Sequence, residues 1–598
     1  MSFGRLLRST CLAALVLGGA APAVRAAPEG KGWRVAHLDE LAVYSQVSDG
    51  KTRDMVEEVA RFRAVLAKLG VGTGASPVPI RLFLFSSSRA YDPFKPAAME
   101  KQSTGGHFQV SAFGHLLALN AYPESGSALP VVFHEYVHEY LHSYYNDLPL
   151  WMDEGLAEFY GTFRIQGSEA QLGLPQADEL GWMREHPMIP LARLFVIDHR
   201  SPEYLKGEDR STLYAESWLL MHYLMVGMPD GGPRVGRFRT ALAAGTPLQK
   251  AFEDSFGMTM AELEGRLRGY LRARLLSYLR MPLAELPKVP SIALADVPPA
   301  EAKFRLATLL VRAGDADAAR AADQLAADAL ALAPDSGDAT LLRAVIAGQG
   351  GRGVEARALE DRAFALGPRD PAGCFVLARS FMERSEEAGA AERARVLLRR
   401  ALAVQPGYAE AQAALGYTYL AAQPAQASEA IIWLQKAVQT LPGRADFARL
   451  LLQAQIADGQ LDRAEATLGR LPGDAVAAAA IARERRTRAV NAALAAGDAD
   501  EALRLMREAV AAESDEAVKR AFGDQLVRLE AQVAERRALQ SREQAERDAF
   551  NQALEAARAG RHREARESLR RLVSTAQSPQ VLEAAKTLLA EVEKLQKR

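Results

Sequence analysis

The chain has 598 residues, of which 49% are hydrophobic and 25% charged, and its formal net charge is -1. This length exceeds what a single hydrophobic core supports, so we expect several domains, and the composition excludes wholesale disorder. The 73 basic and 74 acidic residues nearly cancel and only two cysteines occur. Neither a global positive field for nucleic acid nor a disulfide scaffold is therefore expected.

The first 26 residues have the features of a secretory signal peptide. Arginines precede a short apolar run, and small residues follow it, with cleavage points after Ala23 or Ala26. The run is shorter than the roughly 20 residues that a membrane span needs, so we expect export rather than anchoring. The mature chain would keep only Cys374 and form no internal disulfide. We expect an exported protein, periplasmic or secreted, with no transmembrane segment after cleavage.

Residues 27–284 predict a mixed α and β domain. An apolar stripe of helical spacing predicts a helix over 51–70. Tight alternation of apolar residues predicts strands over 80–86 and 115–123. From residue 129 to about 280 the pattern becomes helical.

A proline-bearing stretch at 285–298 predicts a linker, and after it the chain repeats. Prolines recur at intervals of 34, 38 and 36 residues, each closing an apolar helix: Pro334, Pro368, Pro406 and Pro442. Such a period predicts a solenoid of paired helices over 299–475. Beyond it, residues 476–598 predict degenerate helical repeats and charged C-terminal helices.

The clearest repeat unit, residues 409–442, resembles the tetratricopeptide repeat. The positions that match its pattern are Leu415, Gly416, Tyr419, Ala430 and Leu434. Gln412 stands where that repeat usually carries Trp, which is a departure from the pattern. The resemblance implies an all-α tetratricopeptide-type solenoid that binds a protein partner.

The residues suited to catalysis lie between positions 129 and 160. His134, Glu135 and His138 form H-E-x-x-H on a predicted helix. Four residues advance a helix by about one turn, so both imidazoles point the same way and can share one ion. Glu135 lies beside them, where it can take a proton from a metal-bound water. Hydrolytic zinc usually takes three protein ligands, so a third ligand is expected nearby.

A second helix supplies the candidate for that ligand. Pro149 ends the first helix, and WMDEGLAEFY begins another that folds back on it. This string is similar to the W-x-x-E-G-x-A of gluzincin metallopeptidases, the thermolysin-like and aminopeptidase-type enzymes. The resemblance places the third zinc ligand on Glu154, with 15 residues between it and His138, fewer than in the aminopeptidases. It implies a zincin-like α+β fold and a single zinc ion.

The same resemblance implies two supporting residues. Glu158, one helical turn beyond Glu154, would hold a zinc-binding histidine by its second nitrogen; a solvated helix charge is the alternative. Tyr214, 79 residues after Glu135, would stabilise the oxyanion; a buried core tyrosine is the alternative. Peptides bind such enzymes by adding a strand to a sheet edge, which we expect to be 115–123.

A second H-E-x-x-H, formed by His138, Glu139 and His142, overlaps the first. His134 and His142 lie about 12 Å apart along the helix axis, so one ion cannot bind all three histidines. The first motif is favoured because the apolar run LPVVF precedes it and its ligands stay clear of the helix end. His142 then flanks the site. A degenerate motif that binds no metal is the remaining interpretation.

Two functions are consistent with these patterns. In the first, an exported zinc peptidase, Glu135 deprotonates water and passes the proton to the leaving amine, while the repeats recruit protein. Both endopeptidase and exopeptidase action fit this assignment. In the second, the protein is an envelope scaffold whose repeats bind partners and whose metal domain is inert or structural.

Overall fold

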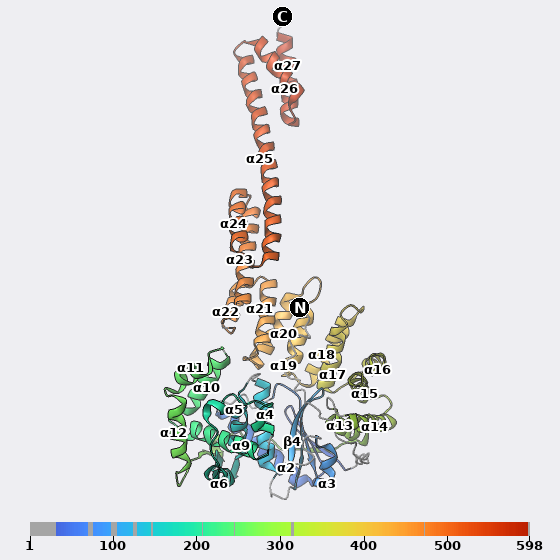
Figure 1. Cartoon of the computed structure of the whole chain (residues 1–598). Helices are drawn as coiled ribbons and strands as arrows, with labels where there is room; N and C mark the ends of the chain where they lie inside the picture. Colours follow the sequence, from blue (N-terminus) through green and yellow to red (C-terminus); the bar gives the residue numbers. More distant parts are fainter. Residues whose placement is uncertain are drawn as a thin grey trace. The chain divides into compact units, whose positions relative to one another are not determined.

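A computed structural model gives the fold of the chain (Figure 1). The structure describes residues 32–69, 76–96, 105–122, 128–144, 148–205, 207–243, 245–311, 316–471 and 473–595. The signal peptide predicted for residues 1–26 lies outside these ranges. Two compact units divide the chain, Met1–Asp474 and Ala475–Arg598.

The first unit is built on a mixed sheet of six strands in the order β4-β5-β3-β2-β1-β9. Their bounds are β1 Arg34–Leu38, β2 Leu41–Ser45, β3 Ile80–Phe85, β4 Gly106–Ser111, β5 Gly114–Asn120 and β9 Leu294–Asp296. Strands β2, β3 and β5 run parallel to one another, whereas β4, β1 and β9 each pair antiparallel with their neighbours. Every residue of β3 and β5 is buried, as expected for strands covered on both faces.

Two features of this sheet differ from the prediction. Strand β5 was expected at the edge, but it lies between β3 and β4, and β4 forms the edge. The glycines before β4 look like a turn in the sequence. Gly106 instead permits close packing, because a Cβ there would lie 2.9 Å from Leu119 Cβ and 3.0 Å from Val131 Cγ1. The linker expected at 285–298 contains β9, which pairs with β1 over three residues.

Helices cover both faces of the sheet. Helix α2 Asp49–Lys68 packs on one face, whereas α3 Ser88–Tyr91 and the short 3-10 helix η1 Asp92–Phe94 contribute Tyr91 and Phe94 to the core on the other face. Most of the predicted apolar stripe of α2 is buried, including Met55, Val59 and Phe62. Phe62 packs against Phe133 of the next long helix with ring centroids 4.6 Å apart. Leu69, the last residue of the predicted stripe, caps the helix and is 38% exposed.

The rest of the N-terminal domain, residues up to 284, is mostly helical; this domain is called the metal domain below, after its candidate metal centre. Its helices are α4 Leu129–Tyr144, α5 Leu150–Gly161, α6 Ala177–Glu185, α7 Leu191–Leu194, α8 Pro202–Leu205, α9 Gly207–His222, the π-helix η3 Tyr223–Gly227, α10 Gly231–Ala243, α11 Leu248–Phe256, α12 Met260–Leu271 and the 3-10 helix η4 Leu283–Glu285. A small second sheet, which the sequence analysis did not predict, interrupts them: β6 Arg164–Gln166, β7 Glu169–Leu172 and β8 Leu279–Pro282.

Paired helices follow at the predicted period. They are α13 Pro299–Leu310, α14 Ala316–Leu332, α15 Gly337–Gln349, α16 Gly353–Leu366, α17 Pro371–Glu383, α18 Ala390–Val404, α19 Ala409–Leu420, α20 Ala427–Thr440, α21 Ala445–Ala457 and α22 Leu461–Leu468. Each recurring proline lies just after the second helix of a pair. Gly416 allows α19 and α20 to approach, because a Cβ there would lie 2.6 Å from Leu434 Cγ. This part of the chain is an all-helical solenoid of paired helices.

The repeats also cover the second face of the main sheet. Ile80, Leu82 and Leu84 of β3 belong to the core shared with α2, α4 and α5. The alternating Phe83 and Phe85 belong to the core that continues into the repeat helices. The uninterrupted apolar run of β3 is therefore explained by burial on both faces.

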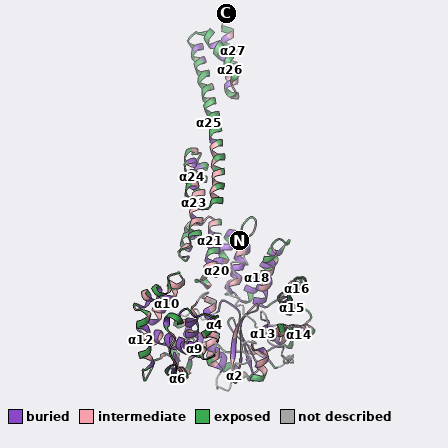
Figure 2. Ribbon diagram, in the orientation of Figure 1, coloured by how far each residue is buried: buried purple, intermediate pink, exposed green. Residues whose placement is uncertain are grey.

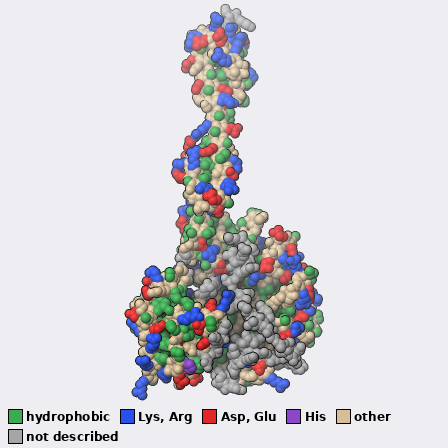
Figure 3. All heavy atoms as spheres, in the orientation of Figure 1, with side chains coloured by type: hydrophobic (Ala, Val, Ile, Leu, Met, Phe, Trp, Pro, Cys, Tyr) green, Lys and Arg blue, Asp and Glu red, His purple; other side chains and the backbone are tan. Residues whose placement is uncertain are grey.

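The second unit consists of five helices: α23 Ala475–Ala495, α24 Ala499–Ala512, α25 Glu516–Arg558, α26 His562–Thr575 and α27 Pro579–Leu595. Helix α25 has 43 residues and is mostly exposed, unlike α4 and α9 (Figure 2). Basic and acidic side chains intermingle on the visible surface of this unit (Figure 3). Within the described ranges, no helix combines the length and the apolar character required to cross a bilayer.

Candidate metal centre

Three side chains from α4 and α5 converge on one point. His138 Nε2 lies 3.1 Å from His134 Nε2 and 3.4 Å from Glu154 Oε2. The third separation, from His134 Nε2 to Glu154 Oε2, is 3.9 Å. Tetrahedral zinc with bonds of about 2.0–2.1 Å needs ligand atoms about 3.3–3.4 Å apart. The three predicted ligands are therefore spaced closely enough to share one zinc ion.

The environment of Glu154 also fits a cation. Among the described residues, its buried Oε2 atom has no hydrogen-bond partner. A buried carboxylate oxygen without a partner is unfavourable, and a metal ion would satisfy it. Glu154 Oε1 is already engaged, since it accepts a hydrogen bond of 2.9 Å from the Tyr214 hydroxyl.

The glycine after Glu154 explains how α5 reaches this position. A Cβ on Gly155 would lie 2.6 Å from the carbonyl oxygen of Ser217 and 3.1 Å from Met221 Cβ, both on α9. Only glycine allows α5 to lie this close to α9, the helix that carries Tyr214. The E-G pair of the motif thus places a ligand on one side of α5 and a close helix contact on the other.

Two carboxylates lie beside the remaining imidazole nitrogens of the ligand histidines. His138 Nδ1 is 3.1 Å from Asp153 Oδ1, and His134 Nδ1 is 3.5 Å from Glu158 Oε1. Such partners fix the orientation and tautomer of a metal-binding histidine. Glu158 is the carboxylate that the sequence predicted at this place. Asp153 was missed, because an acid in the first turn of a helix is unremarkable in sequence.

Asp153 also connects His138 to His142, whose Nε2 lies 2.9 Å from Asp153 Oδ2. Burial raises the pKa of Asp153, but the two histidines outweigh it and hold that pKa well below its ordinary value. Ligand atoms of these three residues lie within 4.8 Å of one another. Their separations are those of ordinary hydrogen bonds, which account for the group without a second ion. His142 thus lies beside the three converging side chains and is joined to them through Asp153.

The environments of Glu135 and Glu139 distinguish the two overlapping motifs. Glu135 is half-buried and, with His134, lines an open cavity of about 940 Å³. Glu139 is fully buried and absent from that lining. It accepts a 2.6 Å hydrogen bond from Ser76 Oγ and lies 3.0 Å from His115 Nδ1. Of these two glutamates, only Glu135 lines the cavity.

Tyr214 lines the same cavity as Glu135. Burial, followed by the charge of Glu154, raises the pKa of Tyr214 far above its ordinary value, so its hydroxyl remains a donor. The structure therefore places Tyr214 at the cavity wall, with its hydroxyl against Glu154.

Other residues of the cavity wall were not foreseen, and they come from segments that follow α5. Burial, then the charges of Glu158 and Asp178, raises the pKa of Glu179 to about 7. Arg210 Nε donates to the backbone oxygen of Tyr204 at 2.7 Å, and both residues line the cavity. Nothing in their local sequence pattern marks them, because only tertiary packing brings them to the metal centre.

No family model matches the chain, and no curated protein matches it. Solved structures similar to it include the pilF protein of Pseudomonas aeruginosa, at 16% identity and TM-score 0.24, covering 38% of this chain and 97% of that one. A thermophilic TPR protein of Thermus thermophilus matches at 22% identity and TM-score 0.21, covering 31% and 98%. The TPR domain of P58(IPK) matches at 14% identity and TM-score 0.20, covering 62% and 99%. Likenesses this weak add nothing to the helix pairs seen in the structure itself.

Proposed function

We propose that the protein is a zinc-dependent peptidase. The convergence of His134, His138 and Glu154, with a buried Glu154 oxygen that faces both imidazoles and accepts no hydrogen bond from the described residues, is the observation that carries this proposal. Zinc, when bound there, supplies Lewis-acid chemistry that activates water and polarises a carbonyl. The cavity of about 940 Å³ beside it has room for a segment of peptide.

The chain's own residues have distinct parts in this chemistry. Glu135 accepts a proton from the attacking water and passes it to the amine that leaves. The Tyr214 hydroxyl, which donates its one proton to Glu154 Oε1 in the structure, would turn from that carboxylate to donate to the oxyanion that develops on the carbonyl oxygen. Asp153 and Glu158 hold the ligand imidazoles in orientation through their Nδ1 atoms.

The proposal is tested with Glu135→Gln in the full chain, assayed on a mixed peptide library. We expect proteolysis to fall at least about a thousandfold, because the variant removes the proton acceptor, while bound zinc is retained. Glu185→Gln is the matched control, since Glu185 is exposed on α6 and does not line the cavity. Full activity in a zinc-bearing Glu135→Gln protein would contradict the mechanism.

A second function, protein binding by the repeats, is supported by the solenoid of helix pairs between α13 and α22. In the combined proposal, the repeats bring a protein substrate or regulator to an exported peptidase. In the alternative, the protein is an envelope scaffold whose metal domain does no chemistry. Zinc-dependent proteolysis that His138→Ala abolishes supports the peptidase, whereas a protein that binds neither zinc nor peptide supports the scaffold.

A further inference from the structure

We propose that the repeats position the metal-binding helix α4, acting through the segment of residues 76–81 that precedes and begins β3. The proposal rests on the zinc site described above and assigns the repeats a part in building it. The contacts that carry it form a continuous path from α17 to the turn of α4 that holds His138.

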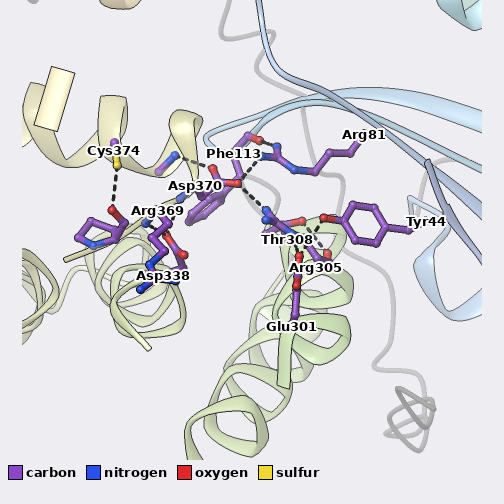
Figure 4. A network of polar contacts seen from close by, with 12 residues as sticks. Tyr44, Arg81, Phe113, Glu301, Arg305, Thr308, Asp338, Arg369, Asp370 and Cys374 are labelled. Atoms are coloured by element: carbon purple, nitrogen blue, oxygen red, sulfur yellow. Dashed lines mark hydrogen bonds and ion pairs between the residues drawn. The ribbon is translucent and has the colours of Figure 1, made fainter. Parts of the chain in front are cut away.

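The path begins at Asp370, the N-cap residue of α17, shown in Figure 4. Its fully buried carboxylate accepts hydrogen bonds from Arg81 of β3 and from Arg305 of α13. Arg81 also donates to the carbonyl oxygen of Phe113, just before β5. One carboxylate thereby joins two repeat helices to two parallel strands of the metal domain. The side chain of Arg81 is only 5% exposed, so water does not compete for this contact.

A second contact holds the other end of the same segment. The backbone N–H of Ala409, at the first turn of α19, donates to the carbonyl oxygen of Pro77 at 3.1 Å. The residue before it, Tyr408, is buried and packs on Phe375 of α17 with ring centroids 5.2 Å apart. Residues 77–81 are thus held at both ends by the repeats.

The segment in turn holds α4. Ser76 Oγ donates to Glu139 Oε1 at 2.6 Å, and the Glu139 side chain is fully buried. His115 Nδ1 lies 3.0 Å from the same oxygen. The backbone N–H of His115 donates to the carbonyl oxygen of Pro79. A buried carboxylate keeps its position only while its partners keep theirs. Because Glu139 follows His138 directly, the placement of Ser76 fixes the turn of α4 that carries a zinc ligand.

Glu139 is therefore a positioning residue and not a second catalytic base. An apolar contact accompanies this path. Phe113, whose carbonyl oxygen accepts from Arg81, packs edge to face on Phe304 of α13, with ring centroids 5.8 Å apart. A module that only captured partners would need no buried ionic contact with the sheet of the peptidase.

The test compares full-length variants at the two ends of the path. Ser76→Ala removes the hydroxyl that holds Glu139, and Asp370→Asn removes the charge that holds Arg81. Zinc affinity is measured by competition with a chelator, and the geometry of the site by the visible spectrum of the cobalt-substituted protein. We expect Ser76→Ala to weaken zinc about tenfold and to change the cobalt spectrum, with a smaller loss for Asp370→Asn.

Two controls separate positioning from general loss of stability. Ser255 matches Ser76 in burial, at 5% exposure, but lies on α11. Asp323, 35% exposed, pairs with Arg343 at 2.9 Å entirely within the repeats, and so controls for the loss of a repeat ion pair. Ser255→Ala and Asp323→Asn should bind zinc like the wild-type protein. If Asp370→Asn does not fold, Arg81→Lys tests the same contact with the charge retained.

The double variant tests whether the two ends belong to one path. Combining Ser76→Ala with Asp370→Asn should weaken zinc by less than the product of the single effects, because both changes release the same turn. Wild-type affinity and an unchanged cobalt spectrum in both single variants would overturn the inference and leave the zinc site standing. A wild-type protein that binds no zinc would overturn the proposed function itself, and this inference with it.

Discussion

The metal domain and the repeats bury their interiors in different ways. Around the metal centre the buried groups include carboxylates and imidazoles, among them Glu139, Asp153, Glu154 and His115. Between the paired repeat helices the buried positions are mostly alanine and leucine, such as Ala430 and Leu434. Substitutions in the first region should therefore alter chemistry first, and those in the second should alter stability first.

The largest expected effect tests which of the two overlapping motifs binds metal. His134→Ala should lose most of its bound zinc and its peptidase activity, because it removes a ligand. His142→Ala should keep both, since the His142 Nε2 atom is already engaged with Asp153 on the flank of the site. Metal analysis and a peptide assay on both variants check this. The reverse pattern would show that the second motif holds the ion.

Next in size is the loss of a group that orients a ligand. Asp153→Asn should weaken zinc binding by about 10- to 100-fold, because His138 Nδ1 loses its charged partner. The protein should remain folded, since the amide can still bond one of the two histidines. Chelator competition measures the affinity, and an unchanged value would mean that Asp153 has no part in holding His138.

Between the paired repeat helices, at positions outside the path through Asp370 and Ala409, the expected effect is on stability alone. Leu434→Ala creates a cavity where α20 meets Gly416 of α19, and should lower the free energy of unfolding by about 2–5 kcal/mol. Zinc affinity of the folded protein should not change, because Leu434 lies away from the path through Asp370 and Ala409. Denaturant unfolding and zinc titration of the same sample measure both. Weakened zinc binding would break the distinction between the two regions.

The smallest effect concerns Glu216, a buried acid of α9 that belongs neither to the cavity wall nor to the candidate ligands. Burial is the main cause that raises the pKa of Glu216 to about 8 from its ordinary 4.5. The unfolded chain releases this proton first, so Glu216 lowers stability progressively as pH rises from about 4.5 to 8. Glu216→Gln should make the fall in melting temperature over this window shallower. If the melting temperature depended on pH identically in both proteins, the raised pKa of Glu216 would be contradicted.

Local patterns predicted the parts of the fold that depend on local spacing. The helical stripe of α2, the strands β3 and β5, the four-residue spacing of His134 and His138, and the proline period of the repeats are all short-range signals. Strands β1, β2, β4 and β9 were missed, because short strands are defined by pairing with distant partners rather than by propensity. The same holds for Ser76 and His115, which meet Glu139 only through the order of the sheet.

The resemblance pointed to Glu154, which the structure places beside His134 and His138, although it said nothing of what surrounds that residue. The roles of Gly155 and Asp153, its two neighbours, became clear only from the contacts of α5 with α9 and α4. Whether Glu154 binds zinc is the claim on which the other assignments depend.

The most direct measurement is therefore the zinc content of the purified full-length protein and of Glu154→Ala, after dialysis against a weak chelator. We predict about one equivalent of zinc in the wild-type protein and a large loss in the variant, because the third ligand is gone. Equal zinc content in both proteins, or none in the wild-type, would contradict the account.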